Sequence, residues 1–79
     1  MRYLISFDLR RIGQDYPSLW AALDSIEAVP VLRSQRVVNR VGATSKGITD
    51  FLRPHIDAND RLLVCAMGEG TQFNLLTQL

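Results

Sequence analysis

The sequence has 79 residues, which is enough for one domain and too few for two. Hydrophobic residues make up 47% of it, which excludes a disordered chain, and the net charge of +1 gives no bulk signal of nucleic-acid binding. The single cysteine, Cys65, excludes an internal disulfide framework. The chain has no apolar stretch near the roughly 20 residues that span a bilayer. Charges interrupt its N-terminal segment, so we expect a cytoplasmic protein without a signal peptide.

Residues 2–8, RYLISFD, predict a β-strand because aromatic and aliphatic residues dominate them. Alternation assigns Tyr3, Ile5 and Phe7 to one face, and it assigns Leu4, Ser6 and Asp8 to the other. Asp8 ends the strand, and arginines follow it closely. Its carboxylate is either an exposed cap paired with Arg10, or a metal-binding or catalytic acid at the edge of a rigid sheet. The strand alone leaves both interpretations open.

Residues 17–28 predict a helix that begins at Pro17, where the missing N–H costs nothing. Asp15 or Tyr16 is expected to cap it. A stripe at helical spacing predicts packing against a sheet rather than a binding surface, and it consists of Tyr16, Leu19, Trp20, Leu23 and Ile26.

Residues 29–41 predict two strands joined by a tight turn. Pro30 restricts the first strand, at 29–32, to the edge of a sheet. Arg33 and Ser34 form the turn, and the second strand runs from 35 to 41. In this second strand, alternation assigns one face to Arg36, Val38 and Arg40.

Residues 42–56 predict a second helix, capped by Thr44 or Ser45 and ended or kinked by Pro54. Its buried stripe is expected to be Ile48, Phe51 and Leu52. Residues 57–60, DAND, predict a turn. Residues 61–67, RLLVCAM, then predict a strand that is apolar on both faces, and the apolar tail at 71–79 is a candidate for a final strand.

The element order β-α-β-β-α-β predicts one α+β domain over residues 1–79. This order is typical of the ferredoxin-like fold, an antiparallel sheet with both helices on one face. Its last strand lies at a sheet edge, and an edge strand that is apolar on both faces needs cover. The apolar tail of a second copy would supply it, so we expect a homodimer.

Several motifs fail on inspection. GATSKG lacks the spacing of a phosphate loop, and DAND lacks the glycine and glutamate of a calcium loop. His55 has no second ligand at metal-binding spacing. Cys65 has no histidine partner and is best explained as a buried small hydrophobic residue.

Arginine supplies eight of the nine basic residues. Its planar fork suits phosphate oxygens, although codon bias in a GC-rich genome explains the same preference. If the chain binds nucleic acid, we expect the contacts on the first loop and the exposed face of the sheet. The expected residues are Arg10, Arg11, Arg36 and Arg40.

Three segments carry a resemblance to a known family: YLISFDL, GQDYPSLWAAL and TDFLRPHIDANDRLLV. They resemble small bacterial proteins of the SinR family. Through these the chain is similar to the superfamily of CRISPR-associated adaptation endoribonucleases and virulence-associated protein D toxins. The resemblance runs from Tyr3 to about Val64.

The resemblance implies a ferredoxin-like homodimer in which the acid that ends the first strand is a metal ligand. Asp8 matches that acid, and two copies near the dimer axis would hold a divalent cation such as Mg²⁺. A serine at the start of the third strand also belongs to the family pattern, and Ser34 matches it. Nuclease members usually continue with an apolar and an aromatic residue, whereas Gln35 and Arg36 follow here.

Two functions therefore stay open. The first is a metal-dependent endonuclease, with RNA the expected substrate more than DNA, in which Asp8 and Ser34 are the catalytic residues of a toxin or defence system. The second is a non-catalytic dimeric module that binds nucleic acid or a protein partner.

Overall fold

The computed structural model describes residues 1–10 and 16–79. Strands and helices follow in the order β1 (Arg2–Asp8), α1 (Pro17–Ser25), β2 (Val29–Leu32), β3 (Gln35–Asn39), α2 (Ser45–Leu52), the 3₁₀ helix η1 (Arg53–His55) and β4 (Arg61–Ala66). The predicted α+β class, with two α-helices and a four-stranded antiparallel sheet, is confirmed. Within the described ranges, no helix is long and apolar enough to cross a membrane.

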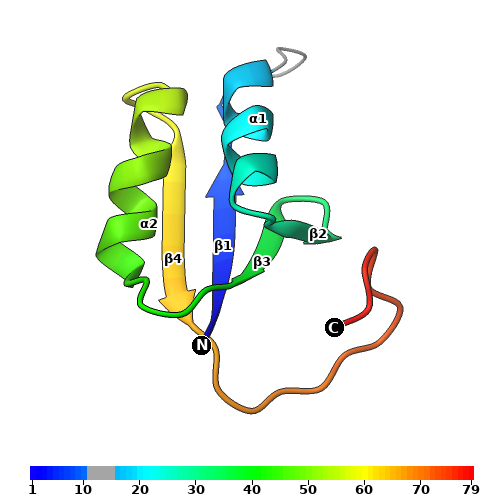
Figure 1. The fold of residues 1–79 in the computed structure, drawn as a ribbon. Coiled ribbons are helices and arrows are strands. Elements are labelled where there is room, and N and C mark those ends of the chain that lie inside the picture. Colours follow the sequence, from blue (N-terminus) through cyan, green and yellow to red (C-terminus); the bar gives the residue numbers. More distant parts are fainter. Residues whose placement is uncertain (11–15) are drawn as a thin grey trace.

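The strands lie in the order β2-β3-β1-β4, and every neighbouring pair is antiparallel. Strand β1 is therefore central, and β4 is an edge strand, as predicted. Both helices lie side by side over the same face of the sheet, and the opposite face carries no helix (Figure 1).

The core lies between the helices and the covered face of the sheet. The alternation predicted for β1 is confirmed, because Tyr3, Ile5 and Phe7 are buried while Leu4, Ser6 and Asp8 are not. The helices contribute the fully or nearly buried side chains Leu19, Leu23, Ile48 and Leu52. The prediction for Phe51 is wrong: it is 43% exposed and packs edge-on against His55 instead of facing the sheet.

Helix α1 ends three residues before the predicted end because the chain forms a Schellman-type turn there. The Glu27 N–H donates to the Asp24 carbonyl and the Ala28 N–H to the Leu23 carbonyl, both at 3.0 Å. Glu27 adopts φ 60°, the left-handed conformation that glycine adopts most easily. Helix α2 is capped as predicted, since the Thr44 side chain accepts a hydrogen bond from the Gly47 N–H.

The C-terminal tail forms no strand, contrary to the prediction. It leaves β4, passes below the sheet and turns back beside β2 (Figure 1). The Leu76 N–H donates to the Val31 carbonyl of β2 at 2.9 Å. The Gln72 side chain bonds to both backbone groups of Leu79, which closes the tail into a loop instead of an extended strand.

We predict that Glu27→Gly raises the free energy of unfolding by about 0.5–1 kcal/mol, because the left-handed backbone conformation costs other residues more than it costs glycine. Glu27→Ala removes the same side chain and keeps the conformational cost. Urea denaturation of both variants beside the wild type checks this. Equal gains in the two variants would show that the side chain, and not the backbone, is the source.

Candidate active site at the end of strand β1

Asp8 ends strand β1 beside a basic residue of the neighbouring strand. In the β1–β4 register it lies directly opposite Arg61. The Arg61 Nη1 donates to the Asp8 Oδ2 at 3.2 Å, and the two side chains are 68% and 60% exposed. The carboxylate thus pairs with Arg61 and not with Arg10, because cross-strand neighbours on one face lie within reach of each other.

Ser34 lies at the same end of the sheet. It belongs to the predicted turn between β2 and β3, and its carbonyl accepts a hydrogen bond from the Phe7 N–H at 3.0 Å. Because Ser6 pairs with Gln35, this bond continues the β1–β3 register by one residue. The fold therefore brings Ser34 to the residue next to Asp8, although Ser34 and Asp8 are 26 positions apart in the sequence.

Arg10 is fixed through its backbone, while its side chain is exposed. The Arg10 N–H donates to the Asp60 Oδ1 at 2.7 Å, and the Tyr16 hydroxyl donates to the same oxygen at 3.2 Å. The other Asp60 oxygen accepts from the Asp57 N–H at 2.8 Å. The Asp60 carboxylate therefore forms hydrogen bonds with the residues after β1, the start of α1 and the turn before β4.

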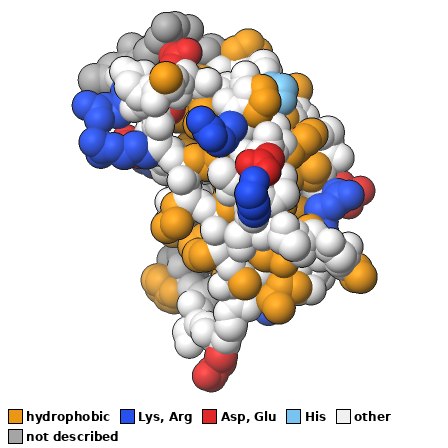
Figure 2. Space-filling view, turned by 90° about the vertical axis from the view of Figure 1, so that its left-hand side faces the viewer, with side chains coloured by type: hydrophobic (Ala, Val, Ile, Leu, Met, Phe, Trp, Pro, Cys, Tyr) orange, Lys and Arg blue, Asp and Glu red, His pale blue; other side chains and the backbone are white. Residues whose placement is uncertain are grey.

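Basic side chains gather at this end of the molecule. Figure 2 looks onto the side formed by α2 and β4, and Lys and Arg side chains group at its upper left, toward the end where β1 finishes. Arg10 and Arg61 belong to this end of the sheet. Arg11, predicted as a phosphate contact, and Asp15, predicted as a helix cap, lie outside the described residues.

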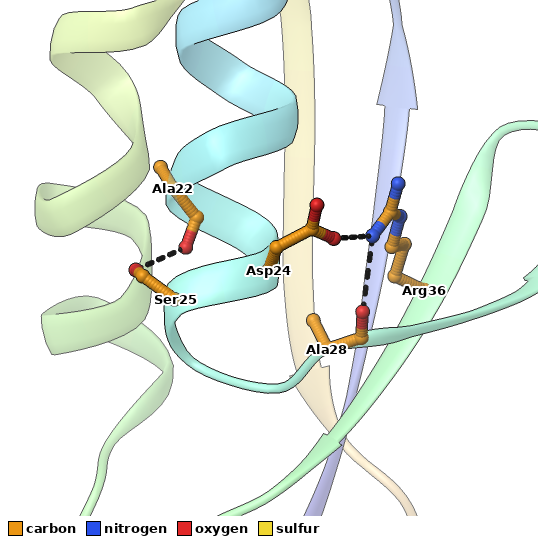
Figure 3. Close-up of polar contacts among 5 residues, drawn as sticks. All are labelled: Ala22, Asp24, Ser25, Ala28 and Arg36. Carbon is orange, nitrogen blue, oxygen red and sulfur yellow. Dashed lines mark hydrogen bonds and ion pairs between the residues drawn. The ribbon is translucent and has the colours of Figure 1, made fainter.

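Arg36 and Arg40 lie away from this site. Arg36 shares a face with the buried Val38, as predicted, but that face is covered by the helices and is not the exposed one. Arg40 lies beyond the end of β3, and its Nη1 donates to the Ile26 carbonyl at 3.5 Å. Arg36 donates to the Asp24 carboxylate at 2.8 Å and to the Ala28 carbonyl at 3.1 Å (Figure 3). It also lies 5.8 Å from the centre of the Trp20 ring, so it holds the end of α1 against the sheet.

Asp8 is the carboxylate that the site offers to a metal ion. In the parts of the chain that the structure describes, no group of three or more His, Cys, Asp or Glu side chains is arranged to hold a cation. Magnesium binds to proteins through one or two carboxylates and keeps several waters. A single exposed carboxylate such as Asp8 meets the lower of these numbers.

Two other features are weaker candidates for a functional site. Ser18 Oγ and His55 Nδ1 are hydrogen-bonded, and among the described contacts no carboxylate orients this histidine, so the pair joins α1 to η1. A cavity of about 300 Å³ lies between the open face of the sheet and the tail. It is lined mainly by Leu4, Val31, Val37 and tail residues, and Arg2 is its charged lining residue.

Our comparisons with family models, curated proteins and solved structures gave no match to this chain. The family resemblance therefore stays a prediction from the residues. Sequence reasoning missed Arg61 as the partner of Asp8 and Asp60 as the tie between three segments. The strand register would have identified Arg61, because Asp8 ends one strand and Arg61 begins its antiparallel neighbour.

We predict that Asp60→Ala lowers the free energy of unfolding by about 2–3 kcal/mol, because two backbone N–H groups and a hydroxyl lose their acceptor. Asp50→Ala is the matched control. It removes an exposed carboxylate that pairs with Lys46 one helical turn away, and it is expected to cost less than about 0.5 kcal/mol. Urea denaturation measures both, and equal losses would show that Asp60 does not hold these segments.

Proposed function

We propose that this protein is a metal-dependent endonuclease of the superfamily of CRISPR-associated adaptation nucleases, acting on RNA more than on DNA. The observation that carries the proposal is that two residues of the family pattern lie at the same end of the sheet. Asp8 ends the central strand, and Ser34 lies beside the residue that precedes it. Two exposed arginines, Arg10 and Arg61, lie at the same end of the sheet.

We also propose that the fold is ferredoxin-like. The support is the element order, the strand order β2-β3-β1-β4 with antiparallel neighbours, and the position of both helices on one face (Figure 1). Because a fold hosts many functions, the residues at the end of β1, and not the fold, support the proposed activity.

Asp8 would hold a magnesium ion with the help of water ligands. Such an ion supplies charge neutralisation at a phosphate and orientation of a water. Arg10 would bind neighbouring RNA phosphates through its guanidinium, which matches phosphate geometry. Ser34 would help to position the RNA backbone beside Asp8 through its hydroxyl.

A protein partner from a defence or toxin system belongs to the same proposal, and a neighbouring integrase-like or antitoxin-like gene would identify it.

The second copy would dock against the outer edge of β4. No segment of the described chain pairs with that edge. The open face of β4 exposes Leu63 at 62%, whereas Val64 on the other face is buried. Cys65 is also exposed on the open face, so the prediction that it is buried is wrong. An unpaired strand edge with exposed apolar side chains favours pairing with another chain. The tail of the same chain bonds to β2 and leaves this edge open.

A non-catalytic dimeric module that binds nucleic acid or a protein is the second candidate. The observation that favours it is the ion pair of Asp8 with Arg61, since an exposed pair at a strand end is a common surface feature. Gln35 and Arg36 after Ser34 also differ from the residues usual in nuclease members. The two candidates differ in what the loss of the Asp8 charge would do.

We predict that Asp8→Asn abolishes cleavage of RNA in Mg²⁺ or Mn²⁺, because the amide keeps the shape of the side chain and loses the charge that holds the cation. The melting temperature is expected to change little, since exposed ion pairs contribute about 1 kcal/mol or less. Mixed RNA and DNA substrates are incubated with the wild type in Mg²⁺, Mn²⁺ or EDTA. Electrophoresis then compares the products with those of the variant.

Asp50→Asn serves as the control, because it makes the same change at an exposed carboxylate on α2. It should cleave as the wild type does. Unchanged cleavage by a folded Asp8→Asn protein would end the catalytic role of Asp8. A wild type that binds RNA but never cleaves it would favour the non-catalytic module.

We predict a homodimer at micromolar concentration that Leu63→Lys converts to monomer, because a charge in the centre of an apolar interface is costly to bury. The fold should survive, since Leu63 is largely exposed within one chain. Val41→Lys is the control, as Val41 is 99% exposed and lies beyond the end of β3. Sedimentation velocity measures all three proteins, and a monomeric wild type would contradict the proposed dimer.

A further inference from the structure

The Asp8 carboxylate already has a positively charged partner within its own chain. Arg61 lies directly opposite it across the β1–β4 pair, with 3.2 Å between the guanidinium nitrogen and the carboxylate oxygen. A divalent cation would need the same carboxylate, and two positive charges that share it repel each other. Binding of a cation at Asp8 therefore favours departure of the Arg61 guanidinium.

We propose that Arg61 is an exchangeable counter-ion of this site: it neutralises Asp8 until a divalent cation arrives, and it then binds a phosphate of the RNA beside that cation. The proposal rests on the proposed function, because it requires a cation at Asp8. It adds a residue that the sequence did not suggest, and it gives that residue a role in both metal and RNA binding.

The surroundings of Arg61 suit such an exchange. Its side chain is 68% exposed, so water can replace Asp8 around the guanidinium at little cost. Its backbone is fixed by pairing with β1, so the side chain stays within reach of the site after it leaves the carboxylate. A free arginine fork then presents parallel N–H donors that match two phosphate oxygens.

Arg36 shows the contrasting case. Its side chain is only 16% exposed, and a carboxylate, a carbonyl and the Trp20 ring all hold it in place. Removing it from these contacts would leave groups of α1 and its following loop without a partner. Arg36 therefore stabilises the fold. Arg61 has a single described ion pair, so its departure from Asp8 would break no further described side-chain contact.

The exchange makes metal and RNA binding interdependent. A cation at Asp8 frees Arg61 for phosphate, and by linkage RNA that engages Arg61 favours the cation by the same factor. A fixed phosphate contact would contribute equally to RNA affinity with and without the cation. This difference separates the exchange from a simple basic patch.

The test compares Arg61→Gln with Arg2→Gln, which removes the same charge from the same face of the sheet but from β1 and not β4. Arg2 is six residues from Asp8 along the strand, or about 20 Å. Calorimetric titration with Mn²⁺ should show that Arg61→Gln binds about threefold to tenfold more tightly than the wild type, from the loss of a nearby positive charge. Arg2→Gln should match the wild type.

RNA affinity is measured by fluorescence anisotropy with a short labelled RNA, in Mn²⁺ and in EDTA, and a gel verifies that the RNA stays intact. Arg61→Gln should weaken binding more in Mn²⁺ than in EDTA. Arg2→Gln should have the same effect in both conditions. These two results together support the exchange.

Three outcomes would contradict the proposed exchange, and they differ in whether the proposed metal site is also contradicted. If the wild type binds Mn²⁺ through Asp8 but Arg61→Gln binds it no more tightly, the exchange is wrong while the metal site stands. If Arg61→Gln weakens RNA binding equally in Mn²⁺ and EDTA, Arg61 is a fixed phosphate contact. If neither the wild type nor any variant binds Mn²⁺, the proposed metal site fails and the exchange fails with it.

Discussion

The central position of strand β1 is the constraint on which the rest of the structure depends. It is hydrogen-bonded to β3 on one side and to β4 on the other, and it contributes more buried side chains to the face that the helices cover than any other strand. Tyr3, Ile5 and Phe7 attract both helices to one face. By alternation the same pattern exposes Asp8 on the opposite face. The carboxylate is therefore held by a rigid strand and is still open to solvent, which is the combination that a ligand for a hydrated cation needs.

Much of this arrangement could be predicted from local patterns. The period of two in residues 2–8 and the helical stripe of Leu19 and Leu23 each identify a buried face without any knowledge of the fold. Thr44 and Pro30 define a helix start and an edge strand for equally local reasons. The predictions for Phe51 and the tail are wrong because their contacts depend on residues outside the local sequence pattern. Phe51 packs on His55, and the tail bonds to β2 and to its own end.

The candidate site could be predicted only in part, because most of its contacts join residues that are far apart in the sequence. Asp8 was identified from its place at the end of an apolar strand. Its partner Arg61 is 53 residues away, and only the strand register shows that the two meet. The position of Arg36 could have been deduced. It shares a face with Val38, and a valine between charged neighbours indicates a face that packs against the helices, so the arginine had to find partners there.

The Asp8–Arg61 pair is weak because both of its side chains are exposed to solvent. A buried ion pair in its place would leave an uncompensated charge whenever one partner moved, and the cost would reach several kcal/mol. An exposed pair is close to neutral in energy, so its members can take new partners with little effect on stability. Elsewhere in the chain the stronger contacts of Asp60 and Arg36 hold the loops and α1 in place. Stability thus depends on other charged residues than Asp8 and Arg61, and the proposed exchange at the end of β1 would leave the sheet beneath it unchanged.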